Sequence, residues 1–270
     1  MKLRYLNLGC GQRFHQDWEN LDFLATAPGV RPHDLRHGIP FSNSSFDVVY
    51  HSHLLEHFPR PDAARLLREC YRVLKHGGII RVAVPDLERI VRLYLEALDK
   101  SLVGDRTWQT RYEWILLEMY DQTVRETSGG CMLEYLHRNP IPERAFVEQR
   151  LGGEFRRLMA RVGGPERTRS RFTFSILRDL LARKVARLAL GREGIHAHDL
   201  GKFRSSGEVH RWMYDQYSLA VSLEKAGFQS PRKLEAAESD IPGWVGFGLD
   251  VEPDGSVYKP DSVFMEAIRS

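Results

Sequence analysis

The turn formed by Gly9, Cys10 and Gly11 is where this chain is best equipped to hold a ligand. It directly follows a short apolar segment, residues 3–8. Because glycine has no Cβ, a Gly-x-Gly turn lets the backbone approach a bound molecule closely. A dinucleotide fingerprint requires a third glycine three residues further on, and Phe14 stands there instead. The turn is therefore a poor cradle for a pyrophosphate.

Two aspartates stand at the ends of strand-like segments. Asp22 lies in residues 20–23, and a carboxylate there accepts well from two neighbouring hydroxyl groups, such as those of a ribose. A solvated loop aspartate is the alternative interpretation. Asp86 follows residues 79–84, and ligands of parallel sheets bind beyond the carboxyl ends of strands. An aspartate that precedes a helix also serves as an N-cap, so Asp86 has a structural interpretation as well.

Histidine titrates near neutral pH, so it is the residue expected to accept a proton from an attacking group. The candidates are His51, His53 and His210. His210 begins a segment that also holds Trp212 and Tyr214, and we expect this segment to close a substrate pocket. In the alternative interpretation, the two aromatic side chains belong to the core and His210 is a surface or capping residue.

Strand-like and helix-like segments alternate in the first third of the chain. The strand-like segments are residues 3–8, 20–23, 30–35, 46–50 and 79–84. Apolar residues recur at helical spacing over residues 60–74, and Gly77 and Gly78 are expected to end that helix. Such alternation implies βαβ units and a parallel sheet, which is an α/β fold. Near the end of the chain we expect a helix at 218–226, a turn at 254–255 between two strand-like arms, and a last strand at 263–268.

The middle of the chain has a different pattern. Residues 87–120 are helix-like, and residues 150–193 hold twelve Lys and Arg against four Asp and Glu. We expect a helical insertion with a basic segment at residues 172–191. This segment has three interpretations: a lid with a solvated basic face, a pocket wall for an anionic substrate, or a helix that binds a membrane surface or a partner.

Composition limits the classes of function. The chain has 270 residues, of which 42% are hydrophobic, and its net charge is only +3, so nothing favours nucleic acid globally. Cys10, Cys70 and Cys131 are too few and too widely spaced for a disulfide framework, which indicates a reduced, cytoplasmic compartment. No apolar run approaches the roughly 20 residues of a membrane span, and the N-terminus lacks the apolar region of a signal peptide.

Taken in order, these segments resemble the class I S-adenosyl-L-methionine (SAM)-dependent methyltransferases of small molecules. The resemblance covers about residues 3–88 and resumes at 218–228 and in the last strand pair. It is carried by Leu6-Asn7-Leu8-Gly9-Cys10-Gly11, Trp18, Asn20-Leu21-Asp22, His33-Asp34-Leu35, Phe46-Asp47-Val48-Val49-Tyr50, Leu55-Glu56-His57 and Glu69-Cys70, followed by Arg72-Val73-Leu74-Lys75-His76-Gly77-Gly78. It implies a Rossmann-like, seven-stranded sheet with helices on both faces and the last strand antiparallel.

The resemblance also implies where SAM would bind. The residues expected at the cofactor are Asn7, Gly9, Cys10, Gly11, Asp22, Asp34, Leu35 and His51. The glycines would line the methionine part, Asp22 would bind the ribose, and Asp34 and Leu35 would border the adenine. His51 would lie under the sulfonium end. The family often has an acidic residue where Asn7 stands, so this chain departs from the pattern at that position.

Residues 53–57 also match the His-x-x-Glu-His pattern of a class of zinc peptidases. On a helix, His53 and His57 would share a face and could ligate zinc. The segment sits where the methyltransferase pattern has Leu-Glu-His, so we expect no metal. Glu56 and His57 would then hold the loop that follows the strand.

These observations predict a SAM-binding core in residues 1–98 and 205–270, with a helical insertion at 99–204 that forms a lid or the acceptor pocket. Asp86, Trp212 and Tyr214 are the expected substrate contacts. We expect O-methyl transfer to a sugar or natural-product hydroxyl, with N-methylation next; a catalytically degenerate SAM-binding regulatory or interaction protein is the alternative. The expected partner is a small acceptor, either anionic or glycan-related, without nucleic acid, a transmembrane segment or more than weak contact with a membrane surface. A homodimer is left open.

Overall fold

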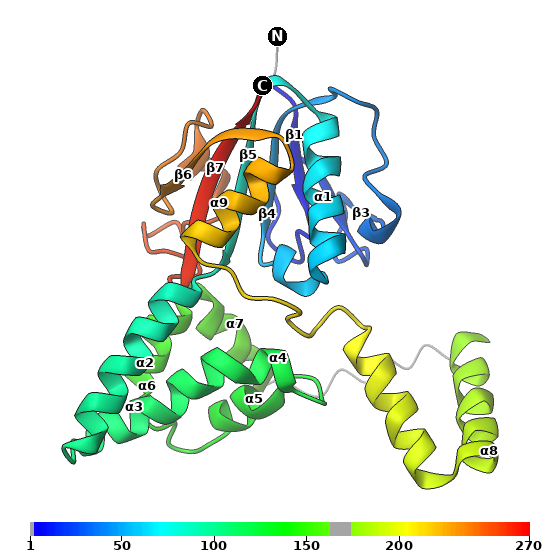
Figure 1. Cartoon of the computed structure of the whole chain (residues 1–270), viewed down its shortest axis with the longest axis vertical. Coiled ribbons are helices and arrows are strands. Elements are labelled where there is room, and N and C mark those ends of the chain that lie inside the picture. Colours follow the sequence, from blue (N-terminus) through cyan, green and yellow to red (C-terminus); the bar gives the residue numbers. More distant parts are fainter. Residues whose placement is uncertain (1–2, 163–173) are drawn as a thin grey trace.

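The strand-like segments pair into one seven-stranded sheet in the computed structural model, which describes residues 3–162 and 174–270 (Figure 1). The strands are β1 (Tyr5–Leu8), β2 (Glu19–Asp22), β3 (Val30–Pro32), β4 (Phe46–Ser52), β5 (Leu74–Pro85), β6 (Phe228–Leu234) and β7 (Ser262–Arg269). Their order is β3-β2-β1-β4-β5-β7-β6. β1 to β5 are parallel, whereas β7 is antiparallel to both β5 and β6. The expected α/β class and the antiparallel last strand are confirmed.

One face of the sheet is covered by α1 (Arg60–Val73) and α9 (Gln216–Lys225). Leu66 and Leu67 of α1, and Leu219 and Leu223 of α9, are buried in the main core against strand residues such as Val49. A capping box at the start of α9 satisfies its first backbone donors. The expected end of the first helix at the Gly-Gly pair is wrong. α1 stops at Val73, and the pair lies inside β5, which is already extended at that point.

The opposite face carries loops and η4, a 3-10 turn at Trp244–Phe247. Trp18 and Tyr50 pack there against Trp244 in a buried aromatic cluster. Arg81 of β5 is fully buried behind this cluster, and its Nε donates to Asp250 at 2.9 Å. The same guanidinium donates to the carboxylate of Glu266 and to three backbone carbonyls. The buried Arg81 guanidinium thus holds the loop that covers this face of the sheet, because its N–H donors point in fixed directions.

The edge strand β6 was not expected from the sequence. Its segment contains Pro231, two basic residues and Ser230 with a left-handed φ of 52°, and its pairing with β7 is irregular. Proline and exposed charges are typical of edge strands, where an unbroken ladder is not required. The two arms around the turn at 254–255 form only an isolated bridge between Val251 and Val257.

Between β5 and α9 the chain leaves the sheet and forms a separate helical layer. We call α2–α7 the helical body. Its elements are α2 (Leu87–Leu102), α3 (Arg106–Leu116), the π-helical turn η3 (Leu117–Asp121), α4 (Gln122–Val124), α5 (Gly130–Leu136), α6 (Arg144–Leu151) and α7 (Gly153–Val162). Trp114, Tyr135, Val147 and Phe155 belong to its core. Gly152 fixes the join to the sheet, because a Cβ there would collide with Pro260 and its φ is 57°.

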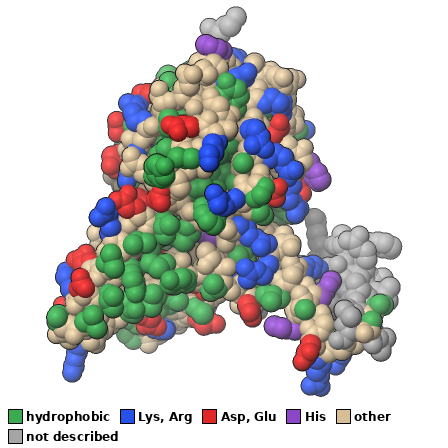
Figure 2. Space-filling model, viewed as in Figure 1, with side chains coloured by type: hydrophobic (Ala, Val, Ile, Leu, Met, Phe, Trp, Pro, Cys, Tyr) green, Lys and Arg blue, Asp and Glu red, His purple; other side chains and the backbone are tan. Residues whose placement is uncertain are grey.

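The helical body exposes apolar side chains on its outer surface. Leu95 and Leu102 of α2 are 52% and 76% exposed, and Figure 2 shows hydrophobic side chains gathered over the end of the molecule that α2 and α3 occupy. No helix among the described residues is long and apolar enough to cross a membrane.

The last helix before the return to the sheet is α8 (Phe174–Arg204), which is broken at Gly191. It lies beside the main mass of the molecule in Figure 1. The start of the expected basic segment, residues 172–173, lies outside the described residues. Lys184 and Arg187 are exposed on α8. All three cysteines are free, as the sequence predicted.

Candidate active site

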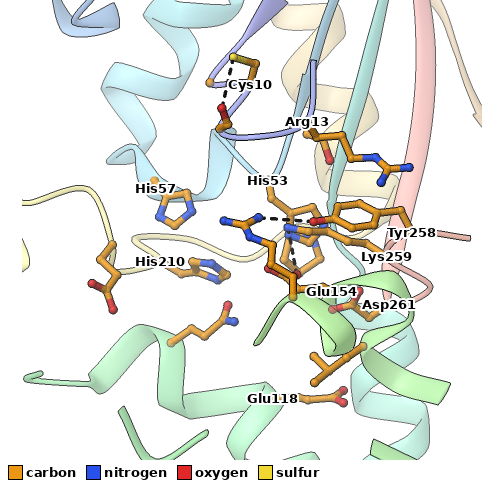
Figure 3. A pocket seen from close by; sticks show the side chains of 18 of the residues that line it. Cys10, Arg13, His53, His57, Glu118, Glu154, His210, Tyr258, Lys259 and Asp261 are labelled. Atoms are coloured by element: carbon orange, nitrogen blue, oxygen red, sulfur yellow. Dashed lines mark hydrogen bonds and ion pairs between the residues drawn. The ribbon is translucent and has the colours of Figure 1, made fainter. Parts of the chain in front are cut away.

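A cavity of about 330 Å³ separates the sheet from the helical body. It opens at the carboxyl ends of β1, β4 and β5, where parallel sheets bind ligands. Figure 3 shows side chains from both halves of the molecule directed into it. The cavity brings together Asn7, Gly9, Cys10, Gly11, His53 and His210 of the expected site residues. The others, which are His51, Asp22, Asp34, Leu35, Asp86, Trp212 and Tyr214, lie outside its lining.

The glycine turn is shaped by two different constraints. A Cβ on Gly9 would lie 2.6 Å from Leu54 Cδ1, so this position is closed by packing. A Cβ on Gly11 would meet nothing within 4 Å, which leaves open space above the backbone on the cavity side. Both residues have positive φ, 61° and 56°, which favours glycine. Burial raises the pKa of Cys10 to about 12, so its thiol is not a nucleophile at neutral pH.

Polar side chains at the ends of β1 and β2 brace this turn. The backbone N–H of Gly11 donates to Asp22 Oδ2 at 2.8 Å. The side-chain amide of Asn7 donates to Asn20 and to the carbonyl of Arg13, both at 3.2 Å. The side-chain amide of Asn7 therefore steadies the loop. The observations fit a nucleoside cofactor: an open cradle at Gly11 with a carboxylate beside it.

Asp34 and Leu35 form the next turn along the same edge. Asp34 caps η1 (Leu35–His37) through the backbone N–H of Arg36, and it also pairs with the Arg36 guanidinium at 2.7 Å. This guanidinium is the main cause that lowers the pKa of Asp34. Leu35 is buried in the sheet core. Both stand beside β2 and β3 and beyond the lining of the cavity.

The two histidines after β4 have different environments. His51 is completely buried in the strand, neither ring nitrogen has a hydrogen-bond partner, and burial lowers its pKa to about 3. His53 lines the cavity, where its Nε2 lies 2.7 Å from Ser262 Oγ and its Nδ1 lies 3.4 Å from Glu56 Oε1. Burial holds the pKa of His53 well below its usual range, so the ring is neutral.

The segment that begins at His210 is divided between the cavity and other surroundings. The His210 ring lines the cavity and packs edge-on against His57, with centroids 4.7 Å apart. Trp212 is 41% exposed, and the Arg60 guanidinium lies 4.6 Å from its ring centroid. Tyr214 is buried in the core of the sheet. Of these three side chains, only that of His210 lines the cavity.

Asp86 has structural contacts that occupy its carboxylate. It caps α2 by accepting from the backbone N–H of Arg89, and Lys233 Nζ lies 3.6 Å from its second oxygen. The carboxylate is buried and lies outside the cavity lining. The structure therefore shows Asp86 as the N-cap of α2.

Charged residues that the sequence did not single out form the far wall. Glu118 and Arg125 come from η3 and the end of α4, Glu154 and Arg157 come from α7, and Lys259 comes from the loop before β7 (Figure 3). Glu118 lies in η3, and Arg125 directly follows α4, so both come from one helical stretch and its end. The nearness of Glu118 and Arg125 along the chain was the signal that the sequence offered. Only the packing of α7 against the loop before β7 shows which charges meet.

The His-x-x-Glu-His segment does not form the helix that a zinc peptidase requires. Only Leu55–His57 is helical, as the 3-10 turn η2, and His53 precedes it with a left-handed φ of 49°. His53 and His57 therefore do not share a helical face. His57 faces His210 instead, and Glu56 between them is completely buried.

Comparison with known proteins agrees with this geometry. Residues 12–82 match the family model described as a methyltransferase domain. A protein of Mycolicibacterium smegmatis, named a probable S-adenosylmethionine-dependent methyltransferase, is 34% identical over 98 residues, which are 30% of this chain and 37% of that protein. The chain thus spans little more than a third of the length of this curated relative.

Two solved structures align with this chain at low TM-scores. A SAM-dependent methyltransferase from Archaeoglobus fulgidus aligns over 98% of this chain and 86% of its own, with 11% identity and a TM-score of 0.39. One from Mesorhizobium loti aligns over 31% of this chain and 47% of its own, with 25% identity and a TM-score of 0.26. Residues 12–82 thus resemble a methyltransferase domain, and the relative from Mycolicibacterium smegmatis is named as SAM-dependent.

Proposed function

We propose that this protein transfers a methyl group from SAM to a hydroxyl of a small polar acceptor, such as a sugar or a hydroxylated natural product. The observation that carries the proposal is one cavity with two unlike walls. The glycine turn forms one wall, the charged helical body forms the other, and His53 and His210 lie between them. Such a cavity holds a cofactor and an acceptor together, and proximity accounts for much of the rate of a displacement.

The cofactor side follows from the turn and the strand ends. SAM supplies a methyl group already activated by its sulfonium. Gly11 leaves room for the methionine part against the backbone, and Asn7 keeps the turn in place. Asp22 stands at the end of β2, where it can exchange its contact with the Gly11 N–H for ribose hydroxyls. Asp34 and Leu35 border the direction in which the adenine would extend.

The acceptor side favours a polar molecule over a strongly anionic one. Lys259 Nζ lies 3.3 Å from Glu154, and Glu118 is paired with Arg150 at 2.6 Å. Because these cations already have carboxylate partners, the wall offers donors and acceptors without a large net charge. A polyhydroxylated acceptor suits such a wall, whereas a phosphorylated one would have to displace the existing pairs. The helical body would thus serve as the acceptor pocket.

His53 is the group best placed to take the proton of an attacking hydroxyl. Its ring is neutral and it borders the cavity. The Glu56 carboxyl, with Oε1 3.4 Å from Nδ1, helps to position the ring. His210 is the second candidate base. An amine acceptor would use the same group, so N-methylation is the nearest alternative.

The proposal is tested by calorimetry and by turnover. Purified protein is titrated with S-adenosylhomocysteine and then incubated with SAM and a panel of hydroxylated and amine acceptors, with methylated product detected by mass spectrometry. We expect binding, and product from a hydroxylated acceptor. Asp22→Asn should weaken cofactor binding by roughly tenfold.

The base is tested separately from the cofactor site. His53→Gln should lower turnover by about 100-fold while leaving S-adenosylhomocysteine binding intact. His76→Gln, at an exposed site at the start of β5, is the control and should match the wild type. Absence of cofactor binding in the folded wild type would overturn the proposal. Binding without product from any acceptor would favour the SAM-binding regulatory or interaction protein.

A further inference from the structure

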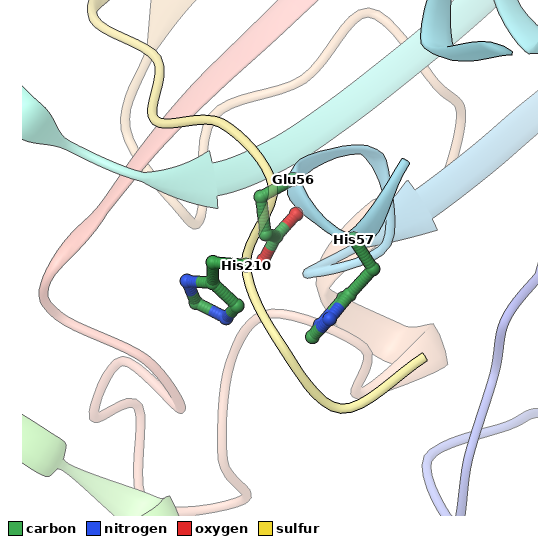
Figure 4. Close-up of side chains that lie close together, drawn as sticks. All are labelled: Glu56, His57 and His210. Carbon is green, nitrogen blue, oxygen red and sulfur yellow. The ribbon is translucent and has the colours of Figure 1, made fainter. Parts of the chain in front are cut away.

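Glu56, His57 and His210 bring three ligand-type atoms into one small space. One atom from each side chain lies within 4.8 Å of the others. Figure 4 shows the three side chains converging from two segments, the turn after β4 and the extended chain before α9. Two imidazoles and one carboxylate are a donor set that binds zinc in catalytic sites.

The carboxylate of Glu56 has an environment that is unusual for a protein interior. The side chain is 0% exposed, and neither of its oxygens has a hydrogen-bond partner within the described residues. A buried carboxyl without donors costs free energy unless a partner compensates for the lost hydration. Apart from His53 Nδ1, which lies 3.4 Å from Oε1 without forming a hydrogen bond, this carboxyl has no partner among the described residues.

The two histidines offer ring nitrogens to the same small space as the Glu56 carboxyl. The Nδ1 of His57 is buried without a hydrogen-bond partner. A buried nitrogen without a partner costs free energy, which a bound ion would compensate.

Backbone hydrogen bonds hold in place the two segments that carry this cluster. The carbonyl of Glu56 accepts from the backbone N–H of Arg211 at 2.6 Å and from that of Trp212 at 3.2 Å. The N–H of His210 donates to the carbonyl of Gln122 at 2.9 Å. Because the cluster is fixed from both sides, a bound ion needs only side-chain adjustment and no movement of the chain.

We propose that Glu56, His57 and His210 bind a divalent transition ion of the zinc class. Three protein ligands leave a fourth position, and since His57 and His210 line the cavity, that position faces the acceptor. An ion there can bind an acceptor oxygen and stabilise its deprotonated form. The site does not depend on SAM, and with His210 as a ligand it leaves His53 as the base.

The test measures metal binding alone, so its outcome is distinct from that of methyl transfer. The full chain is stripped with a chelator, desalted and titrated with zinc against a chromogenic competitor. We expect one zinc per chain in the wild type, and a loss of affinity on the order of 100-fold in Glu56→Gln and in His210→Gln. Cobalt added to the stripped wild type should give the visible absorption of a four- or five-coordinate ion.

Two control variants sharpen the assignment. His53→Gln removes the other histidine of the sequence pattern and should retain zinc binding. The double variant His196→Gln and His198→Gln removes an exposed pair on α8 and should also retain it. Thermal melts establish that each variant is folded. A folded wild type that binds neither zinc nor cobalt, or affinity that depends on the α8 pair instead of Glu56 and His210, would overturn the proposal.

Discussion

The sheet and the helical body meet at the same cavity but bury different kinds of side chain. The main core of the sheet is made of strand and helix residues that are almost completely buried and apolar. The core of the helical body is smaller, and buried ion pairs lie beside it. Arg150 with Glu118 is one such pair, and Arg125 with Asp121 is another.

This difference indicates that the sheet and the helical body have different roles. Apolar packing fixes the position of the glycine turn, which a cofactor of constant shape requires. Charges in the helical body set the shape and polarity of the other wall, where acceptor specificity would reside. Ion pairs hold their geometry only while both partners are present, since removal of one leaves the other buried and unpaired. The helical body should therefore be the more easily altered half of the molecule.

The largest effect is expected from Trp114→Ala in the helical body. Trp114 is completely buried, so the substitution leaves a large cavity and should cost about 4 kcal/mol. Hydrogen exchange should rise in α3, α5 and α6, while the strands keep their protection and S-adenosylhomocysteine binding persists. Equal loss of protection in the sheet would contradict the independence of the two halves.

Arg81→Met tests a place where the sheet also depends on buried charge. Removal of the guanidinium leaves Asp250 and Glu266 without their cation, so unfolding by urea should show a loss of about 3 kcal/mol. The exposed pair of Arg232 with Asp240 provides the matched control, because Arg232→Met should cost less than about 1 kcal/mol. A similar small effect of both variants would mean that the Arg81 cluster is not a structural support.

The third prediction concerns pH and the wall of the cavity. Burial, followed by the charge of Glu118, raises the pKa of Asp261 from 3.8 to about 6, against the opposing effects of Arg150 and Lys259. The folded chain therefore keeps a proton that the unfolded chain has released between these values. Its contribution to stability falls as the pH rises from about 4 to about 6.

Asp261→Asn removes that titration. Relative to the variant, the wild type should lose on the order of 2 kcal/mol of unfolding free energy across this window, as measured by urea titration at several pH values. A constant difference between the two proteins from pH 4 to pH 7 would show that Asp261 does not titrate in this range.

The smallest effect is expected from His51→Leu in the sheet core. Both ring nitrogens of His51 are buried without partners, so an apolar side chain of similar size removes a desolvation cost. Stability should be unchanged or increase by up to about 1 kcal/mol, and S-adenosylhomocysteine affinity should stay the same. Loss of cofactor binding in a folded His51→Leu variant would show that His51 does contribute to the cofactor site.

The sequence by itself determined the frame of this protein. Alternating strand and helix patterns predicted the α/β sheet, since periodicity reports which face of an element is buried. The glycine turn was evident from its position after β1, because its residue types and their spacing are local properties. The edge strand β6 escaped notice because its proline and its charges weaken the pattern that marks buried strands.

Only the tertiary structure decided which residues share the cavity. In a continuous strand, His51 and His53 would point to the same face, but the left-handed backbone at His53 turns its side chain into the cavity while His51 stays in the core. Likewise, Glu56 and His57 meet His210 only because the chain returns from the helical body beside the turn after β4. Such contacts join segments more than 150 residues apart, and local sequence patterns carry no information about them.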